Sequence, residues 1–497
     1  MSEQPIDFSQ RRRQNPAAIP LILLNLAQQL IRRFWPIVII LLVNPRKIGD
    51  SFWTVAVLVV AFGSAISSLI AYFRFYFHLE GRHFIVEKGA LQRSRIGIPL
   101  ERIQSVQLHQ PFLHRLLGVV QVDIDTAGSA ESEISIRALS YPEAKSLKNL
   151  LLSGKQETQV PEPDQAVSEP APAEKQLLAL SIKDLLLIGL TQNHLRTAMV
   201  LLGLVYGLYW QLDDLFGKAF REWANAQLPA VWQWMSGPAL LLIVIPLLLL
   251  AVILTMTNTV LRFYQLSFVR RGDRFEVGSG LLNHTEQAAN LPKIQRMSWS
   301  ATLFQRRLRW YTLRLWQAGS ETGKHQALLQ VPGARQQQIY SVGQAYFPEI
   351  HEAGSRHTFS RYLISRRVLY GGFLPALAAT LLSWNTFGIY AGLCLLWIPW
   401  MYWYNRRYQQ LSYLEIKSGG LQLYQCAFGE STDVLIWSKI QGITIQQSPF
   451  QRRKSIADLT LHTAGGNIAI PYLDLALAQE IMDFGLYEVE AKDAAWM

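Results

Sequence analysis

The chain has 497 residues, of which 50% are hydrophobic and 17% charged, with a formal net charge of +11 and a mean hydropathy of +0.12. This balance excludes both a pure bundle of membrane helices and a purely soluble protein, because long apolar segments alternate with substantial polar mass. Two cysteines exclude a disulfide framework, and neither lies in a motif that indicates redox chemistry.

In chain order, the apolar segments predict six membrane-spanning helices arranged as three hairpins. The predicted spans are 34–43 and 52–73, 197–212 and 238–261, and 368–384 and 387–404. The first segment is the weakest, because a span needs about 20 predominantly apolar residues and Pro36 interrupts this shorter run. The interiors of the predicted spans contain no Asp, Glu, Lys or Arg, which disfavours an ion or proton pathway.

The segments between the hairpins predict an α+β membrane protein in which each hairpin is followed by a small β-rich domain. The predicted organisation is 1–73 (surface helix and first hairpin), 74–152 (first domain), 153–175 (disordered acidic, proline-rich linker), 176–261 (surface helix and second hairpin), 262–350 (second domain), 351–403 (linker, surface helix and third hairpin) and 404–490 (third domain). Short runs that alternate apolar and polar residues predict strands, and a helical stretch closes each domain.

The three domains carry the same landmarks at the same separation. A basic residue, Ile and Gln are followed by an Ala-Gly pair whose glycine lies 25 residues after the isoleucine; the isoleucines are Ile103, Ile294 and Ile440, and the glycines are Gly128, Gly319 and Gly465. A Phe with basic residues lies between the landmarks, beginning at Phe112, Phe304 and Phe450. Gly118 follows this motif in the first copy, whereas the other two copies have no glycine there. The recurrence indicates one fold in three copies.

These landmarks resemble those of the YdbS/YdbT family of bacterial membrane proteins, which contain bacterial pleckstrin-homology (PH) domains. The resemblance rests on Ile-Pro-Leu-Glu-Arg-Ile-Gln at 98–104, Gln-Pro-Phe-Leu-His-Arg-Leu-Leu-Gly at 110–118 and Thr-Ala-Gly at 126–128. The triplicated layout is similar to that of the YdbT family. It implies that each domain is a PH-like β-barrel or sandwich with a C-terminal helix. It also implies a YdbS-like companion protein and a role in envelope stress or antimicrobial-peptide resistance.

Arginines flank the predicted hairpins on the side of the domains. Arg196 and the pair Arg366-Arg367 precede outgoing segments, while Arg74 and Arg262 follow returning ones. Because cytoplasmic flanks carry an excess of Lys and Arg, the domains and both termini are expected in the cytoplasm of a bacterium, at its inner membrane.

No arrangement of residues indicates catalysis, and no cofactor or metal is expected. There is no nucleophile motif, no phosphate-binding glycine-rich loop and no Cys-x-x-Cys pair. His351 and His357 are not four residues apart, as two zinc ligands on one helix face would be. We therefore expect a protein that is not an enzyme.

The candidate site is electrostatic and lies mainly in the second domain, which has 12 Lys and Arg against 5 Asp and Glu. The candidate contacts for anionic lipid are Arg270, Arg271, Arg274, Arg306, Arg307, Arg309, Arg452 and Arg453. Each base near an anionic leaflet contributes about 1 kcal/mol of attraction, and Arg pairs well with phosphate. The alternative is a generic basic surface, in which Phe304 packs in the core and the arginines are only solvated.

The sequence thus predicts a non-enzymatic membrane protein whose PH-like domains form a scaffold for lipids, for copies of the chain or for a companion protein. A transporter or lipid-handling protein is the alternative. No nucleic-acid partner is expected, because no strand interleaves aromatic and basic residues as known reading modules do.

Overall fold

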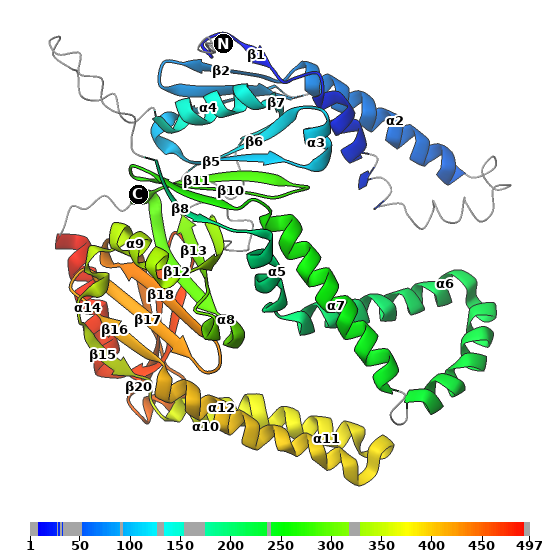
Figure 1. Cartoon of the computed structure of the whole chain (residues 1–497), viewed down its shortest axis with the longest axis vertical. Helices are drawn as coiled ribbons and strands as arrows, with labels where there is room; N and C mark the ends of the chain where they lie inside the picture. The colour runs from blue at the N-terminus through cyan, green and yellow to red at the C-terminus, as the bar shows by residue number, and fades with distance from the viewer. Residues whose placement is uncertain are drawn as a thin grey trace.

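The structure is a computed structural model of the chain. It describes residues 8–26, 28–29, 32, 52–89, 93–126, 134–153, 174–235, 240–317 and 329–491. The described strands form four antiparallel sheets. In Figure 1 the sheets form a stack with the N-terminal part at the top, and the long helices extend from one side of it.

The strands belong to three units of the same design: three strands, a short 3-10 turn, three further strands and a closing helix. Unit 1 comprises β2 (Tyr76–Glu80), β3 (His83–Lys88), β4 (Ser94–Pro99), β5 (Ile103–Gln110), β6 (Val119–Thr126), β7 (Ile134–Ser140) and α4 (Tyr141–Ser153). Unit 2 comprises β9 (Ser267–Arg271), β10 (Arg274–Ser279), β11 (His284–Asn290), β12 (Ile294–Ala301), β13 (Tyr311–Gln317), β14 (Leu329–Ala334) and α9 (Gln336–Tyr346). Unit 3 comprises β16 (Tyr413–Ile416), β17 (Gly420–Cys426), β18 (Glu430–Ile436), β19 (Ile440–Gln446), β20 (Ile456–Thr463), β21 (Ile468–Asp474) and α14 (Leu475–Ala491).

One more strand from upstream in the chain pairs with the first strand of each unit. These strands are β1 (Arg12–Arg13), β8 (Glu174–Ala179) and β15 (Ser355–Thr358). The sequence predicted a surface helix from residue 176, but residues 174–179 form β8, and the helix α5 begins only at Ile182 (Ile182–Leu190). Pairing of this segment with β9 overrides its helical pattern.

The landmark isoleucines lie where the 3-10 turn enters the fourth strand of each unit. The turns are η2 (Leu100–Arg102), η3 (Leu291–Lys293) and η7 (Trp437–Lys439), and the isoleucine that follows each is almost completely buried. Each isoleucine therefore belongs to the core of its unit, which explains its recurrence.

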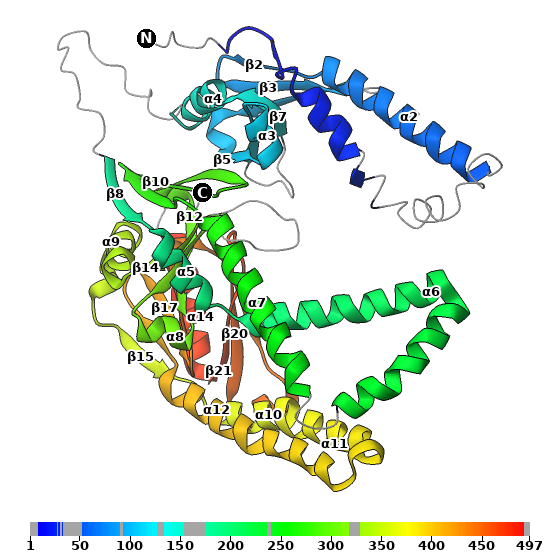
Figure 2. The same ribbon diagram turned by 45° about the vertical axis from the view of Figure 1, so that its right-hand side comes forward.

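Neighbouring units share their sheets. The strand order β7-β6-β5-β11-β10-β9-β8 joins the second half of unit 1 to the first half of unit 2, and β14-β13-β12-β18-β17-β16-β15 joins unit 2 to unit 3 in the same way. We call the β5–β11 pairing joint 1 and the β12–β18 pairing joint 2. The remaining sheets, β1-β2-β3-β4 and β19-β20-β21, lie at the two ends of this arrangement (Figure 2).

The predicted set of six spans as three hairpins is wrong for the described part of the chain. Two helical stretches are long and apolar enough to cross a membrane, Val244–Phe263 and Tyr362–Asn385. A third candidate exists only if Ile182–Leu190 and His194–Val205, which meet at an angle of 69°, form one broken span. The predicted span 34–43 lies outside the described residues.

Helix geometry explains the difference, because hydropathy reports composition but not helical continuity. The helices that contain the predicted spans, with α10 that leads into the third hairpin, are α2 (Phe52–Phe73), α6 (His194–Met235), α7 (Leu240–Phe263), α10 (Tyr362–Val368), α11 (Leu374–Phe387) and α12 (Trp397–Leu411). The predicted span 197–212 does not end at 212, since α6 continues through polar residues and bends at Gly217. The predicted span 387–404 is divided between a 3-10 segment, Gly388–Leu396, and α12, whose C-terminal half is polar. Within the described part of α2, the apolar helix that meets the hydropathy criterion is Phe62–Phe73, which is too short to cross a membrane.

Candidate membrane-facing site

A short helix follows the fourth strand in each unit and contains the Phe-basic motif. The helices are α3 (Phe112–Leu116), α8 (Leu303–Arg307) and α13 (Pro449–Arg452). Two of them begin with a capping box. The hydroxyls of Thr302 and Ser448 accept hydrogen bonds from the backbone amides of Gln305 and Gln451, respectively. In return, the side-chain oxygens of these glutamines accept from the backbone amides of Thr302 and Ser448. Pro111 precedes α3 instead.

The turn that ends each short helix has the same shape in all three units. Gly118, Arg309 and Ser455 occupy equivalent positions and have φ angles of 68°, 56° and 49°. Glycine adopts this left-handed conformation readily, whereas other residues pay a steric cost. The turn is thus retained in the two copies that have no glycine.

The phenylalanine of each motif points outward rather than into the core. Phe112, Phe304 and Phe450 are 56%, 66% and 53% exposed. Leu303 and Leu308 beside Phe304 are also exposed. The alternative in which Phe304 packs in the core is therefore wrong, and each short helix presents apolar side chains together with basic ones.

The short helices lie at the end of each unit that is nearest the long apolar helices. In unit 2, the Thr302 hydroxyl donates to the carbonyl of Thr191 at 3.2 Å, and the Gln305 amide donates to the Thr191 hydroxyl at 3.2 Å. Thr191 connects α5 to α6. In unit 3, the guanidinium of Arg366, on α10, lies 5.5 Å from the centre of the Phe450 ring.

In unit 1 the short helix α3 and the apolar helix α2 line a common cavity. His114, on α3, lines a cavity of 780 Å³ with Tyr72 near the end of α2. Burial lowers the pKa of His114, so this imidazole favours the neutral form.

The eight arginines predicted as lipid contacts fall into separate groups. Arg306, Arg307 and Arg309 lie on α8 and its terminal turn, and Arg452 and Arg453 lie on and just after α13. Arg306 also reaches into the next unit, with its Nε 3.3 Å from a Glu430 carboxylate oxygen and a terminal nitrogen 3.2 Å from the Sγ of Cys426. Arg306 therefore belongs to joint 2 as well as to the basic surface.

The structure places Arg270, Arg271 and Arg274 at the opposite end of unit 2 from α8. They lie at the turn between β9 and β10, where Arg271 and Arg274 both contact the carboxylate of Glu276, at 3.2 and 3.1 Å. The amide of Leu291, just before β12, donates to the carbonyl of Asp273 in this turn. Because α8 follows the other end of β12, the eight-residue strand separates the two groups by roughly 25 Å.

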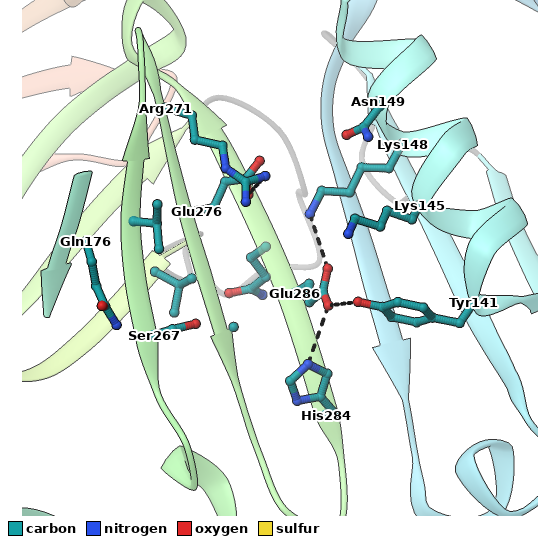
Figure 3. A pocket seen from close by; sticks show the side chains of 14 residues that line it. Tyr141, Lys145, Lys148, Asn149, Gln176, Ser267, Arg271, Glu276, His284 and Glu286 are labelled. Carbon is teal, nitrogen blue, oxygen red and sulfur yellow. Dashed lines mark hydrogen bonds and ion pairs between the residues drawn. The ribbon is translucent and has the colours of Figure 1, made fainter. Parts of the chain in front are cut away.

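A second polar site, which the sequence did not predict, lies at joint 1 (Figure 3). Glu286, on β11, accepts from the Tyr141 hydroxyl at 2.6 Å and lies 3.7 Å from the Lys148 ammonium and 3.6 Å from His284. Tyr141 and Lys148 both come from α4 of unit 1, and the Lys148 side chain is only 5% exposed. These residues line an open cavity of 590 Å³.

The charges in this cavity are held by their neighbours. The hydrogen bond from His284, with that from Tyr141 and the charge of Lys148, lowers the pKa of Glu286 to about 2. Burial and the bond to Glu286 raise the pKa of Tyr141 to about 12, while burial lowers the pKa of Lys148. Glu286 thus remains ionised and links two units. Its partners Tyr141 and Lys148 are far from it in the sequence, so no local pattern could have revealed this contact between units.

Among the described residues, no group of three or more His, Cys, Asp or Glu side chains is arranged to hold a metal ion. His351, part of the spacing considered in the sequence, instead packs its ring 5.0 Å from that of Tyr340.

The three units and their position beside long apolar helices define a membrane protein built from PH-like domains. The family model described as "Bacterial PH domain" matches three times, over residues 22–155, 219–341 and 363–488, so the chain belongs to this family. The chain is also 22% identical to the transmembrane protein YdbT of Bacillus subtilis (strain 168) over 462 residues. This aligned region covers 90% of this chain and 91% of the relative. The resemblance to the YdbT family and a membrane location are therefore confirmed. No solved structure matches the chain.

Proposed function

We propose that the chain is a non-enzymatic membrane scaffold whose three PH-like units rest on the cytoplasmic face of the membrane through α3, α8 and α13. The observation that carries the proposal is that the same short helix, in three copies, exposes a phenylalanine beside arginines at the end of the unit nearest the apolar helices. The arginines that flank the apolar segments support the cytoplasmic side.

Energetics favour insertion of these helices at the interface. Burying a phenylalanine side chain contributes roughly 1.5–3 kcal/mol, and each arginine near anionic lipid adds about 1 kcal/mol. Arg307, Arg309 and Arg453 supply the charge beside the exposed phenylalanines, whereas Arg270, Arg271 and Arg274 lie too far from α8 to share this surface. The contribution of arginine falls as salt screens the leaflet, while that of phenylalanine does not.

Depth measurements on the full-length protein in nanodiscs test the proposal. In a background with Cys394→Ser and Cys426→Ser, a fluorophore on Phe304→Cys should be quenched by lipids that carry a quencher near the headgroup. The matched control is Asp273→Cys, at the opposite end of unit 2, which should not be quenched. Equal quenching at the two positions would refute the proposal.

A second arm separates charge from apolar insertion. Arg307→Gln/Arg309→Gln should reduce the quenching at position 304 in anionic nanodiscs at low salt and have little effect in zwitterionic ones. If the double substitution has the same effect in both lipids, the arginines do not recognise anionic headgroups.

The physiological part of the proposal is a role in envelope stress or antimicrobial-peptide resistance, which rests on the family resemblance alone. It predicts that a strain without the gene is more sensitive to membrane-active peptides, and that a Phe112→Asp/Phe304→Asp/Phe450→Asp variant fails to restore resistance. Restoration by that variant would separate the physiological role from the membrane-facing surface.

A further inference from the structure

Two strand edges interrupt the pattern in which each unit joins the next. In joint 1 the fourth strand of unit 1, β5, pairs with the third strand of unit 2, β11, and in joint 2 the equivalent strands β12 and β18 pair. The third strand of unit 1, β4, and the fourth strand of unit 3, β19, have no such neighbour among the described residues. They correspond by position to the two strands that pair in each existing joint.

The two existing joints have the same register. Leu108 lies opposite Glu286 in joint 1, and the equivalent residues Trp299 and Thr432 lie opposite each other in joint 2. One residue further along, His109 and Thr285 correspond to Ser300 and Ser431. The joint is therefore a repeated structure with a fixed alignment, and not an accidental contact between strands.

The free strands expose positions that the existing joints bury. Gly97 of β4 is exposed, whereas its equivalents Ala288 and Val434 are 2% and 0% exposed. On β19, Ile443 is only partly buried, whereas its equivalent Met297 is completely buried. An open edge of this kind offers unpaired backbone groups to another strand.

A basic side chain beside each existing joint bonds across that joint, whereas its equivalent beside the free strand is exposed. The ammonium of Lys439 donates to the carbonyl of Pro292 in unit 2 at 2.8 Å, and that of Lys293 donates to the carbonyl of Ile103 in unit 1. The equivalent residue of unit 1 is Arg102, which is exposed. Arg102 is thus the basic residue at the position that bonds to the preceding unit in both existing joints.

The side chains near the two free strands carry opposite charge close to the position that Glu286 and Lys148 occupy in joint 1, although the uncharged Met482 stands at the position of Lys148 itself. Arg95 of β4 stands at the position of Glu286, while α14 presents Gln479 and Asp483 at the positions of Lys145 and Asn149. Arg95 now pairs with Glu80 at 2.7 Å in an exposed contact. Such a surface pair contributes less than about 1 kcal/mol and is easily exchanged for another partner.

We propose that β19 of one chain pairs with β4 of a second copy of this chain, so that the copies join head to tail through a third joint of the same register. The proposal deepens the scaffold function by assigning the surface through which the scaffold assembles. Because the two surfaces differ, the contact is heterologous, and it extends into a ring or an open filament according to the rotation between copies. The predicted partners are Ile445 with Arg95, and Gln446 with Ser94.

One contact in the proposed joint, at the end nearest the apolar helices, should make assembly depend on the charge of the lipid. In joint 2, Arg306 meets Glu430, but the equivalent residues in the new joint are Arg452 and Arg93, which repel each other. An anionic headgroup between them removes the repulsion. Assembly should therefore be stronger in anionic than in zwitterionic lipid.

Disulfide cross-linking of the full-length protein tests the register. Two differently tagged chains, one with Gln446→Cys and one with Ser94→Cys, are mixed in nanodiscs or membranes in the Cys394→Ser/Cys426→Ser background. Residues directly opposite on paired strands are close enough for a disulfide. Oxidation should convert the 56.6 kDa chain into a species of twice that mass that carries both tags.

The chain supplies its own controls. Ser300→Cys/Ser431→Cys occupies the same two positions in joint 2 and should form an intramolecular disulfide, which shows that the geometry permits one. Gln446→Cys with Ile96→Cys is two residues out of register and should yield much less dimer. If the in-register pair yields no more dimer than the out-of-register pair, while Ser300→Cys/Ser431→Cys oxidises, the proposal is overturned.

The lipid condition has its own variant. Arg452→Glu replaces the repelling pair by an attracting one and should raise the yield of dimer in zwitterionic lipid, whereas a fall in yield would contradict the proposed register. A cross-linked species in native membranes that carries one tag and a smaller protein would show a different occupant and overturn pairing with a second copy. Since quenching at position 304 is measured separately, loss of cross-linking does not bear on the membrane-facing site.

Discussion

Replacing Glu286 by glutamine should weaken joint 1 by removing the carboxylate that forms an ion pair with the buried Lys148, which leaves Glu276, among the described residues, as the one negative charge that acts on it. The Lys148 side chain is 5% exposed and its ammonium lies 3.7 Å from the Glu286 carboxylate. Removing one partner of a buried ion pair costs roughly 3–5 kcal/mol. Glu286 keeps 22% of its side chain exposed, so we expect the low end of this range, about 3 kcal/mol, which corresponds to roughly a hundredfold increase in opening of the joint.

Amide hydrogen exchange of the full-length protein at pH 7 measures this opening. Peptides from β5 and β11 should exchange about a hundredfold faster in Glu286→Gln, since each 1.4 kcal/mol is a factor of ten. Peptides from β20, in unit 3, should be unchanged and serve as the internal control. The double variant Lys148→Met/Glu286→Gln removes the buried charge and should recover most of the protection. Unit 3 already has methionine, Met482, at the position of Lys148.

Two results would refute this reasoning. If exchange of β5 and β11 is unchanged in Glu286→Gln, the ion pair does not hold the joint. If the double variant is no better protected than Glu286→Gln alone, the loss arises from the bond between Tyr141 and Glu286 and not from the broken ion pair of Lys148.

Further predictions concern pH, packing and backbone strain. The pKa of Glu286 is lowered from 4.5 to about 2, so ionised Glu286 stabilises the folded state fully above pH 4.5, and this stabilisation is lost as the pH falls toward 2. The thermal unfolding temperature of Glu286→Gln should therefore fall less than that of the unchanged chain over this pH range. Gly465→Val should weaken joint 2 by about 1–3 kcal/mol, since a Cβ there would lie 3.0 Å from that of Gln295 and 3.2 Å from that of Trp316. Gly442→Ala, whose nearest neighbour is 3.9 Å away, is the control in the same exchange experiment. Arg309→Gly should raise thermal stability by about 1 kcal/mol by relieving the left-handed conformation, whereas Arg307→Gly should lower it.

The sequence predicted the recurring features of each unit better than the contacts between units. The spacing from Ile103, Ile294 and Ile440 to the Ala-Gly landmarks identified equivalent positions, and the three isoleucines are core residues. Periodicity reports which face of a strand is apolar, but not which distant strand will lie beside it. Periodicity therefore could not predict that Leu108 lies opposite Glu286.

Two other differences have specific causes. The outward position of Phe304 could not be derived from the motif, because a short amphipathic turn is compatible with either direction of the phenylalanine. The spans were overcounted because the apolar segment Gly388–Leu396 adopts 3-10 geometry, and because the 197–212 segment continues into a longer helix that bends at Gly217. Only the structure of the backbone reveals such interruptions.

One position that differs in charge among the three units lies where each unit meets a different neighbour. Glu286 faces Lys148 in joint 1, Thr432 replaces Glu286 in joint 2, and Arg95 occupies that position on the free strand. In contrast, the left-handed turn after each short helix persists at Gly118, Arg309 and Ser455 although only the first is glycine. A strained turn is retained only where its shape matters, and here it ends the helix that turns Phe112, Phe304 or Phe450 outward. The copies have therefore kept the proposed membrane-facing surface in common and diversified the surfaces directed at one another, as the proposed scaffold requires of units that occupy fixed places in a row.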